Sequence, residues 1–380
     1  MKRALLLTSP MLLLAVSAPA ADGPALDPNQ PYKAKRSDPV TYEVDFSAVV
    51  TAPYHTKKLR VWLPLPQSDA GQEVQEISLD TFPVKVEPKI ATEPKFGNRF
   101  AYFEFDHPEG GQIIRHRFKV KVWELRWGVD PAKVAKVERW PAGFDRYLKP
   151  DKSVAVNDDL RKLLGEIIPE RRGEATDLAA VMGWVNDHLT YDHGHASLKA
   201  SSLHALNERR GHCSDYHGLC AAFGRALGYP TRITYGINPF PKNSPSHCKV
   251  EAYLPPYGWV SFDVAETQKY LGTIKKAPGL EPAKKEALLK AARARLLAGF
   301  RDNTWFVQTR GTDYALAPPA AKRAPVVRTL YAEADGVALP EPDPADAKKH
   351  AFAWMTVHKF TPDRKVPYPF SDWKTLETQP

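Results

Sequence analysis

The hydrophobic period of this chain changes once, near residue 150, and that change limits its possible folds. Before it, apolar and polar residues alternate, as in Tyr42, Val44 and Phe46 and again over residues 118–122. Strict alternation predicts strands with one buried face. After it, apolar residues recur every three or four positions, as over residues 160–168, and this spacing predicts amphipathic helices. A chain of 380 residues with two such regions is long enough for two domains.

The first region, residues 39–135, is predicted to be an N-terminal β-sandwich domain, because five or more short strands separated by Pro, Gly and Asp are typical of that architecture. In the second region, residues 136–335, helices are followed by short strands between residues 231 and 264. This order predicts an α+β fold with the helices packed on an antiparallel sheet. Residues 336–380 are rich in Pro, Asp and aromatic residues without a clear period. We expect an irregular or docked C-terminal extension there.

The N-terminus carries the pattern of an export signal. Lys2 and Arg3 precede an apolar run, and the small-residue sequence Ala-Pro-Ala follows at residues 18–20. This arrangement predicts a signal peptide over residues 1–20 that is cleaved after residue 20, which places the mature protein in the periplasm or outside the cell. Residues 21–38 are polar and rich in proline, and predict a flexible leader. No other stretch approaches about 18 uninterrupted apolar residues, so we expect no membrane insertion.

The charge of the chain disfavours nucleic acid as a partner. Cleavage after residue 20 removes two basic residues and no acidic ones, so the net charge falls from +9 to +7. The remaining lysines and arginines are mixed with acids, and no basic block is interleaved with aromatic residues. Nucleic-acid-binding domains concentrate their basic residues on one face or stripe. The sequence indicates no cofactor and no metal, and contains nothing that predicts an oligomeric state.

Cys213 is the strongest candidate for a catalytic residue. It follows Gly211, which is predicted to end one helix, and it opens the next helix. A helix N-terminus lowers the pKa of a thiol and directs backbone N–H groups toward a developing oxyanion. Downstream, His247 begins one predicted strand and Asp263 ends the next, so an antiparallel hairpin would bring them to the same end. A thiol, an imidazole and a carboxylate form a nucleophile, its base and the group that orients the base.

The other cysteines have simpler interpretations. Cys220 lies at an apolar helix position and is expected to be a buried small side chain. Cys248 alternates away from His247 on its strand, so we expect it to have a packing role. Cys213, His217 and Cys220 share one helix face, and His247 would complete a tetrahedral zinc site. We disfavour that alternative because zinc cysteines usually occur as pairs two residues apart, and this chain has no such pair.

Three motifs of this chain resemble the transglutaminase-like superfamily, which has a papain-like fold. They are GHCSDYHGLCAAFGRALGYPTR at residues 211–232, SHCKVEAYLPPYGWVSFD at residues 246–263 and RGTDYALAPP at residues 310–319. The β-rich region before them is similar to an N-terminal domain that many bacterial members carry. The resemblance implies that Cys213 is the nucleophile, His247 the general base and acid, and Asp263 the orienting carboxylate. It also implies a peptide or protein substrate.

One position departs from the pattern of the family. Members often have tryptophan two residues after the histidine, where this chain has Lys249. If Lys249 points into the cleft it makes one wall polar and favours hydrolysis over acyl transfer, and if it leans out to solvent it has no effect on the cleft. The function we expect is an exported thiol enzyme that acts on amide bonds through an acyl-enzyme, either as a peptidase or amidase or as a protein-glutamine acyl transferase. The alternative is a non-catalytic binding protein of the cell envelope.

Overall fold

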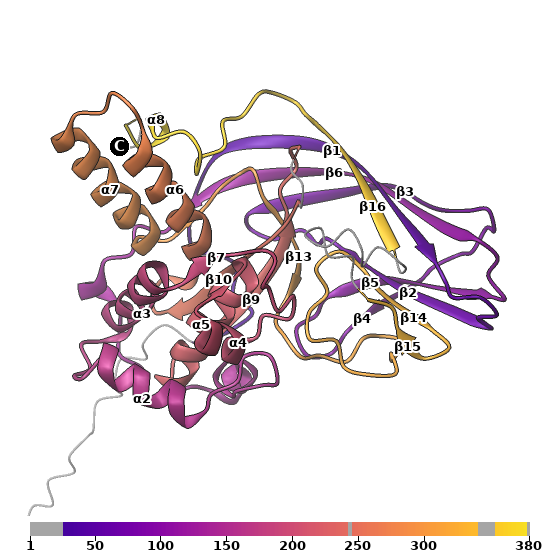
Figure 1. The fold of residues 1–380 in the computed structure, drawn as a ribbon, viewed down its shortest axis with the longest axis horizontal. Coiled ribbons are helices and arrows are strands. Elements are labelled where there is room, and N and C mark those ends of the chain that lie inside the picture. Colours follow the sequence, from indigo (N-terminus) through magenta and orange to yellow (C-terminus); the bar gives the residue numbers. More distant parts are fainter. Residues whose placement is uncertain (1–25, 242–244, 341–353, 378–380) are drawn as a thin grey trace, which may run out of the picture.

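The computed structural model describes residues 26–241, 245–340 and 354–377. Two regions lie side by side along the longest axis of the molecule, a helical region and a region of long strands (Figure 1). In the strand-rich region two antiparallel sheets pack face to face, and residues from both sheets share one hydrophobic core. The predicted signal peptide, residues 1–20, lies outside the described residues.

The first sandwich sheet has the order β12-β6-β1-β16, with β3 also paired to β6. Its strands are β1 (Lys35–Thr51), β3 (Gln72–Phe82), β6 (Gly111–Arg126), β12 (Phe300–Arg301) and β16 (Trp354–Pro362). The second sheet has the order β15-β14-β2-β5-β4. Its strands are β2 (Lys58–Leu65), β4 (Lys89–Thr92), β5 (Arg99–Asp106), β14 (Tyr331–Ala334) and β15 (Val337–Ala338). The long strands alternate between buried and less buried residues, as the sequence predicts for a sandwich.

The helical region contains a four-stranded antiparallel sheet of order β11-β10-β9-β13. Its strands are β9 (Thr231–Ile237), β10 (Ser246–Leu254), β11 (Gly258–Phe262) and β13 (Phe306–Arg310). The longer helices are α2 (Asp158–Ile167), α3 (Glu174–His188), α4 (Ser202–Glu208), α5 (Cys213–Ala226), α6 (Val264–Lys276) and α7 (Pro282–Leu297). The short elements are η1 (Pro131–Lys133), η2 (Ala142–Phe144), α1 (Asp145–Leu148), β7 (Thr190–Tyr191), β8 (Arg210–Gly211) and α8 (Lys374–Glu377). The predicted α+β fold behind an N-terminal sandwich is confirmed.

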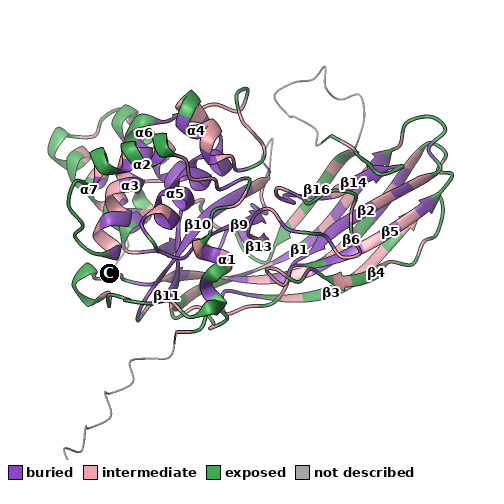
Figure 2. Cartoon of the chain, turned by 90° about the horizontal axis from the view of Figure 1, so that it is seen from below, coloured by how far each residue is buried: buried purple, intermediate pink, exposed green. Residues whose placement is uncertain are grey.

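Helix α5 is the central helix of this region. It is buried over residues 213–225 and packs on β9 and β10 with α3, α4 and α6 around it (Figure 2). The fold needs a glycine at residue 218, because a Cβ there would lie 2.4 Å from the carbonyl oxygen of Ala200. This close approach holds the loop before α4 against α5. The first turn of α5 is therefore fixed by packing on several sides, which a precisely positioned nucleophile requires.

The C-terminal extension is docked and largely regular where it is described. Strand β16 pairs with β1 in a continuous antiparallel register from Tyr42 opposite Pro362 to Val50 opposite Trp354. The sequence pattern hides this edge strand because the apolar residues Met355 and Val357 are 62% and 59% exposed. The extension is thus docked, which is one of the two outcomes expected for it, and its described part includes a regular strand.

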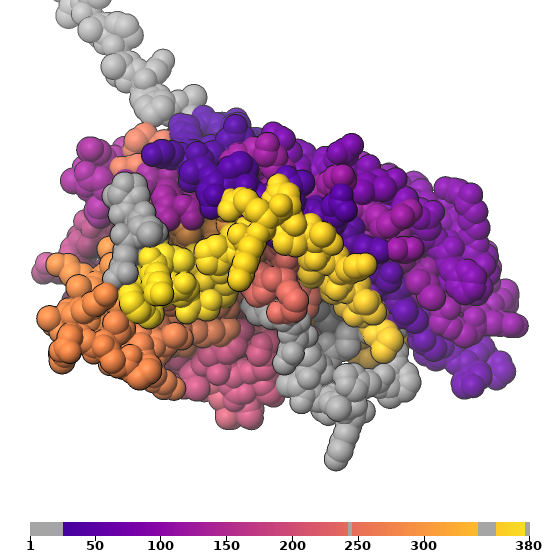
Figure 3. Space-filling model, turned by 90° about the horizontal axis from the view of Figure 1, so that it is seen from above, coloured from indigo at the N-terminus to yellow at the C-terminus, as the bar shows by residue number. Residues whose placement is uncertain are grey.

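After β16 the chain leaves the sandwich and runs along the surface to the helical region (Figure 3). It is held there by hydrogen bonds from Arg295 to the carbonyl of Pro369 at 2.9 Å and from Tyr270 to the carbonyl of Asp372 at 3.0 Å. Phe370 is buried in a small cluster with Tyr270 between α6 and α7. The C-terminal segment therefore contacts both regions of the molecule.

The leader is not flexible from residue 26 onward. The indole N–H of Trp259 donates to the carbonyl of Pro28 at 2.8 Å, and the hydroxyl of Tyr32 donates to Glu251 at 2.7 Å. Strand β1 then begins at Lys35, inside the range predicted to be flexible. Proline-rich polar composition concealed this docking, because the segment is held by hydrogen bonds and ring contacts to residues that are distant in sequence.

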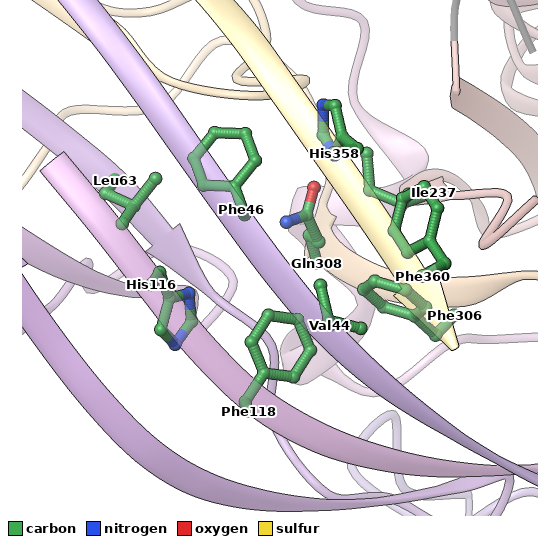
Figure 4. A pocket seen from close by; sticks show the side chains of 10 residues that line it. All are labelled: Val44, Phe46, Leu63, His116, Phe118, Ile237, Phe306, Gln308, His358 and Phe360. Carbon is green, nitrogen blue, oxygen red and sulfur yellow. The ribbon is translucent and has the colours of Figure 1, made fainter. Parts of the chain in front are cut away.

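The sandwich and the four-stranded sheet of the helical region share packed side chains. Ile237 of β9 and Phe306 of β13 belong to the hydrophobic core of the sandwich. A cavity of about 10 Å³ lies at this junction (Figure 4), which is room for about one water molecule. It is lined by Val44, Phe46, Leu63, His116, Phe118, Ile237, Phe306, Gln308, His358 and Phe360. The junction is thus a packed interface that fixes the ends of β9 and β13. Within the described ranges, no helix is both long enough and apolar enough to cross a membrane.

Candidate active site

The three predicted catalytic residues come from adjacent elements and lie together in the structure. Cys213 is the first residue of α5, His247 lies at the start of β10, and Asp263 follows β11 and caps the N-terminus of α6. In the β10–β11 hairpin Val250 pairs with Phe262, so the next position of the register places Asp263 opposite Lys249. Residues two apart on a strand share a face, and Asp263 therefore reaches both Lys249 and His247.

The start of α5 is held in place by an acidic residue in its first turn. Asp215 accepts hydrogen bonds from the backbone N–H groups of His212 and Ser197, both at 3.1 Å. Gly211 makes this possible, because it has φ 154° and a Cβ there would lie 2.5 Å from Asp215 Oδ2. Gly211 does not end a helix as predicted. Helix α4 stops at Glu208, and Gly211 belongs to strand β8, which lies between α4 and α5. The prediction that Cys213 opens a helix is confirmed.

His247 lies between the carboxylate and the thiol. Its Nε2 is 2.8 Å from Asp263 Oδ2, which leaves Nδ1 for the sulfur of Cys213, and the imidazole hydrogen-bonds that sulfur. Burial opposes the charged imidazole, but Asp263 and the Cys213 sulfur outweigh it and raise the pKa of His247 to about 9. Burial likewise opposes the charge of Asp263, and His247 with Lys249 nevertheless hold its pKa well below the ordinary value.

The electrostatics favour a thiolate at Cys213. A hydrogen bond from Cys248 is the largest cause of its lowered pKa, burial opposes it, and the charge of His247 adds to it. The pKa of Cys213 lies well below its ordinary value and that of His247 lies above its own. These two shifts favour a thiolate–imidazolium pair, which is the activated form of a cysteine nucleophile.

Cys248 is more than the packing residue that strand alternation predicts. It is buried, and its thiol hydrogen-bonds the Cys213 sulfur. On its other side, His217 Nδ1 lies 3.4 Å from the Cys248 sulfur while His217 Nε2 accepts the backbone N–H of Val264 at 3.1 Å. Burial lowers the pKa of His217 to about 4, so this ring is neutral and carries its proton on Nδ1. A chain of hydrogen bonds thus runs from His217 through Cys248 to the nucleophile.

Lys249 occupies neither of the two positions that the sequence suggested. It is 1% exposed, and its ammonium lies 2.6 Å from Asp263 Oδ2 and 2.9 Å from Asp302 Oδ2. Its ammonium also faces the rings of Trp305 at 5.0 Å and Phe370 at 5.4 Å. Burial would lower the pKa of Lys249, but the two carboxylates raise it. Lys249 therefore neither makes the cleft polar nor reaches solvent. Its buried ammonium stabilises the negative charge of Asp263.

The remaining residues of the zinc hypothesis do not assemble. Cys220 is buried, and burial raises its pKa above the ordinary value, which makes it an unreactive thiol. In the part of the chain that the structure describes, no group of three or more His, Cys, Asp or Glu side chains is arranged to hold a metal ion.

Limited alkylation should label Cys213 first. We expect iodoacetamide to modify Cys213 at neutral pH at least about tenfold faster than Cys220 or Cys248, because only Cys213 is a thiolate there. Because the pKa of Cys213 lies well below its ordinary value, the rate should rise much less steeply between pH 7 and pH 9 than the roughly tenfold per unit of an ordinary thiol. Peptide mapping of timed reactions measures both, with Cys213→Ala as the control. Equal labelling of the three cysteines, seen only after denaturation, would contradict the assignment.

Comparison with known proteins agrees with this geometry. Residues 161–264 match the family model described as Transglutaminase-like superfamily, and that range contains Cys213, His247 and Asp263. An uncharacterized protein of Haemophilus influenzae is 21% identical over 368 residues, covering 88% of this chain and 97% of that protein. A crystal structure described as a putative cysteine protease from Cytophaga hutchinsonii has a TM-score of 0.60 at 15% identity and covers 88% of this chain and 95% of that chain.

The periplasmic domain of TgpA from Pseudomonas aeruginosa is also similar, with 17% identity, a TM-score of 0.31 and coverage of 58% of this chain and 88% of that chain. The fold and the arrangement of Cys213, His247 and Asp263 define a papain-like domain. Residues 161–264 of this chain form a domain of the transglutaminase-like superfamily.

Proposed function

We propose that this protein is an exported thiol enzyme that attacks the carbonyl of an amide and forms an acyl-enzyme on Cys213. The observation that carries the proposal is the buried series Cys213–His247–Asp263, in which a thiol at a helix start faces an imidazole held 2.8 Å from a carboxylate. Export rests on the signal pattern in residues 1–20. The substrate class we propose is a peptide, or a glutamine or asparagine side chain of a protein.

The first half-reaction forms the acyl-enzyme. The thiolate of Cys213 adds to the carbonyl carbon, and the electron pair of the C=O bond moves to oxygen, where the backbone N–H of Cys213 stabilises it. When the tetrahedral intermediate collapses, the C–N bond breaks and the imidazolium of His247 gives its proton to the departing amine. Asp263 keeps the imidazole oriented and stabilises its charge throughout.

The second half-reaction releases the acyl group. His247, now neutral, removes a proton from water or from an amine as that group attacks the thioester carbonyl. The C–S bond breaks, the thiolate of Cys213 returns, and the product is a free acid or a new amide. The proton stays on His247, which restores the starting ion pair.

Water is the acceptor we propose. Because Lys249 is buried, it does not form the polar cleft wall that would favour hydrolysis. Another polar side chain, Glu266, lies beside His247. Glu266 Oε1 is 4.0 Å from His247 Nδ1 and 2.9 Å from the ammonium of Lys269, whose side chain is 34% exposed. Lys269 exposes one side of this ion pair to solvent, which favours water over an apolar path for an amine.

Product analysis tests both the reaction and the acceptor. The purified protein is given a glutamine-containing peptide with a millimolar primary amine, and mass spectrometry follows the products. We expect free acid to exceed the amide-linked adduct, and Cys213→Ala to form neither. Predominance of the adduct would overturn the choice of water but not the thiol mechanism. Turnover that survives Cys213→Ala, or no turnover of any peptide amide by the wild type, would favour the non-catalytic binding protein.

A further inference from the structure

A tyrosine lies beside the nucleophile although it is distant in sequence. The two-residue strands β7 and β8 pair in parallel, with Tyr191 opposite Gly211. Backbone hydrogen bonds from Thr190 to Arg209 at 2.9 Å and from Asp192 to Gly211 at 2.8 Å close this ladder on both sides. Because Gly211 is two residues before Cys213, the ladder fixes the backbone of Tyr191 next to the N-terminus of α5.

The side chain of Tyr191 is directed at the catalytic cysteine. Its hydroxyl lies close enough to the backbone N–H and to the sulfur of Cys213 for both to act on its pKa. The ring is held by a tilted contact with the ring of Tyr216 at 5.9 Å between centroids and by the ammonium of Lys269 at 3.6 Å. The hydroxyl also lies 3.4 Å from Nε2 of His193. The backbone N–H of Cys213 is the donor that a papain-like mechanism needs for the oxyanion, so this hydroxyl occupies the edge of that position.

The hydroxyl is also in the right state to donate. Burial is the largest cause that raises the pKa of Tyr191, and the negative charges of Cys213 and Glu266 add to it. The hydroxyl therefore keeps its proton at neutral pH. A neutral, buried O–H next to the point where negative charge develops costs little to reorient during the reaction.

We propose that Tyr191 is a further catalytic residue, whose hydroxyl donates the second hydrogen bond to the oxyanion of the tetrahedral intermediate, beside the backbone N–H of Cys213. This proposal rests on the acyl-enzyme mechanism proposed above. In the resting protein the hydroxyl oxygen lies beside the N–H of Cys213. When the substrate carbonyl oxygen enters, it takes over that N–H, and the hydroxyl turns to donate to the same oxygen.

The chain offers a matched control for this role. Tyr216 contacts Tyr191 and is fully buried, but its hydroxyl points away from the site and shares its one proton between the carbonyl oxygen of Leu189 and Oε1 of Gln268, both at 2.8 Å. Tyr191→Phe and Tyr216→Phe therefore remove the same hydroxyl group from neighbouring rings. Only the first removes a donor at the oxyanion.

The test compares turnover with alkylation in the full chain. We expect Tyr191→Phe to lower kcat for the glutamine-containing peptide by about 10²–10³, with KM changed only a few-fold. Its rate of Cys213 alkylation by iodoacetamide should stay within about threefold of wild type, because displacement at a saturated carbon forms no oxyanion. Tyr216→Phe should keep kcat within about threefold.

Two results would overturn the proposal. One is a kcat of Tyr191→Phe within a few-fold of wild type, measured where Cys213→Ala abolishes turnover; the thiol mechanism would then stand without Tyr191. The other is an equal fall in turnover and in alkylation, which would mean that Tyr191 acts on the thiolate instead. Turnover that persists in Cys213→Ala would instead overturn the proposed function.

Discussion

Replacing Asp263 with asparagine should lower turnover by about 10⁴ while leaving the protein folded. The amide can hold the wrong imidazole tautomer, and it has no charge to stabilise the imidazolium. Asp263 is also the largest of the contributions that raise the pKa of His247 to about 9. Without it that pKa falls, so the thiolate–imidazolium pair should persist over a narrower range, and the alkaline limb of the pH profile should move to lower pH.

Asp302→Asn is the matched control for this variant. The ammonium of Lys249, which pairs with Asp263, also lies 2.9 Å from Asp302 Oδ2. Among the described residues, no ion pair joins Asp302 to His247. We expect Asp302→Asn to lose far less turnover than Asp263→Asn, and His247→Ala to be at least as damaging as Asp263→Asn. Steady-state kinetics on the glutamine-containing peptide, with circular dichroism to verify folding, measures the series. A turnover rate for Asp263→Asn within a few-fold of wild type would show that Asp263 has no part in the mechanism.

Replacing Lys249 with methionine should lower the free energy of unfolding by about 3–5 kcal/mol, because it leaves a buried carboxylate without its partner. Asp302 loses the cation that lies 2.9 Å from it, whereas Asp263 keeps His247. The double variant Lys249→Met with Asp302→Asn removes the uncompensated charge, so it should recover part of the loss. Urea unfolding followed by tryptophan fluorescence measures all three proteins. A loss below about 1 kcal/mol for Lys249→Met, or no recovery in the double variant, would contradict the charge network.

The sequence predicts the site where short-range rules determine it. The position of Cys213 at a helix start follows from Gly211 and the apolar spacing after it, and the hairpin rule brings His247 and Asp263 to one end. Strand alternation also places Lys249 on the face of His247. Its burial could not be predicted, because the second carboxylate, Asp302, is 53 residues away in a segment without a period.

Sequence reasoning missed several features because they depend on contacts between distant segments and leave no regular hydrophobic pattern. Strand β7 has two residues, too few for any period to indicate that Tyr191 would be paired beside Gly211. In strand β16 the apolar residues Met355 and Val357 are exposed, so the hydrophobic pattern of this strand does not indicate its buried face. Cys248 lies on the strand face opposite to His247, and only the packing of α5 on β10 reveals that this face also meets the nucleophile.

The docking of the C-terminal segment sets the order in which the molecule can be completed during synthesis. Strand β1 is made early, yet its partner β16 is made only after the whole catalytic domain. The chain that follows β16 supplies Phe370, whose ring faces the ammonium of Lys249 behind Asp263. Pairings between such distant segments form slowly. The surroundings of Lys249 are therefore complete only after Phe370 has been made, and a chain interrupted before β16 would lack both the edge of its first sheet and one wall of the charge network.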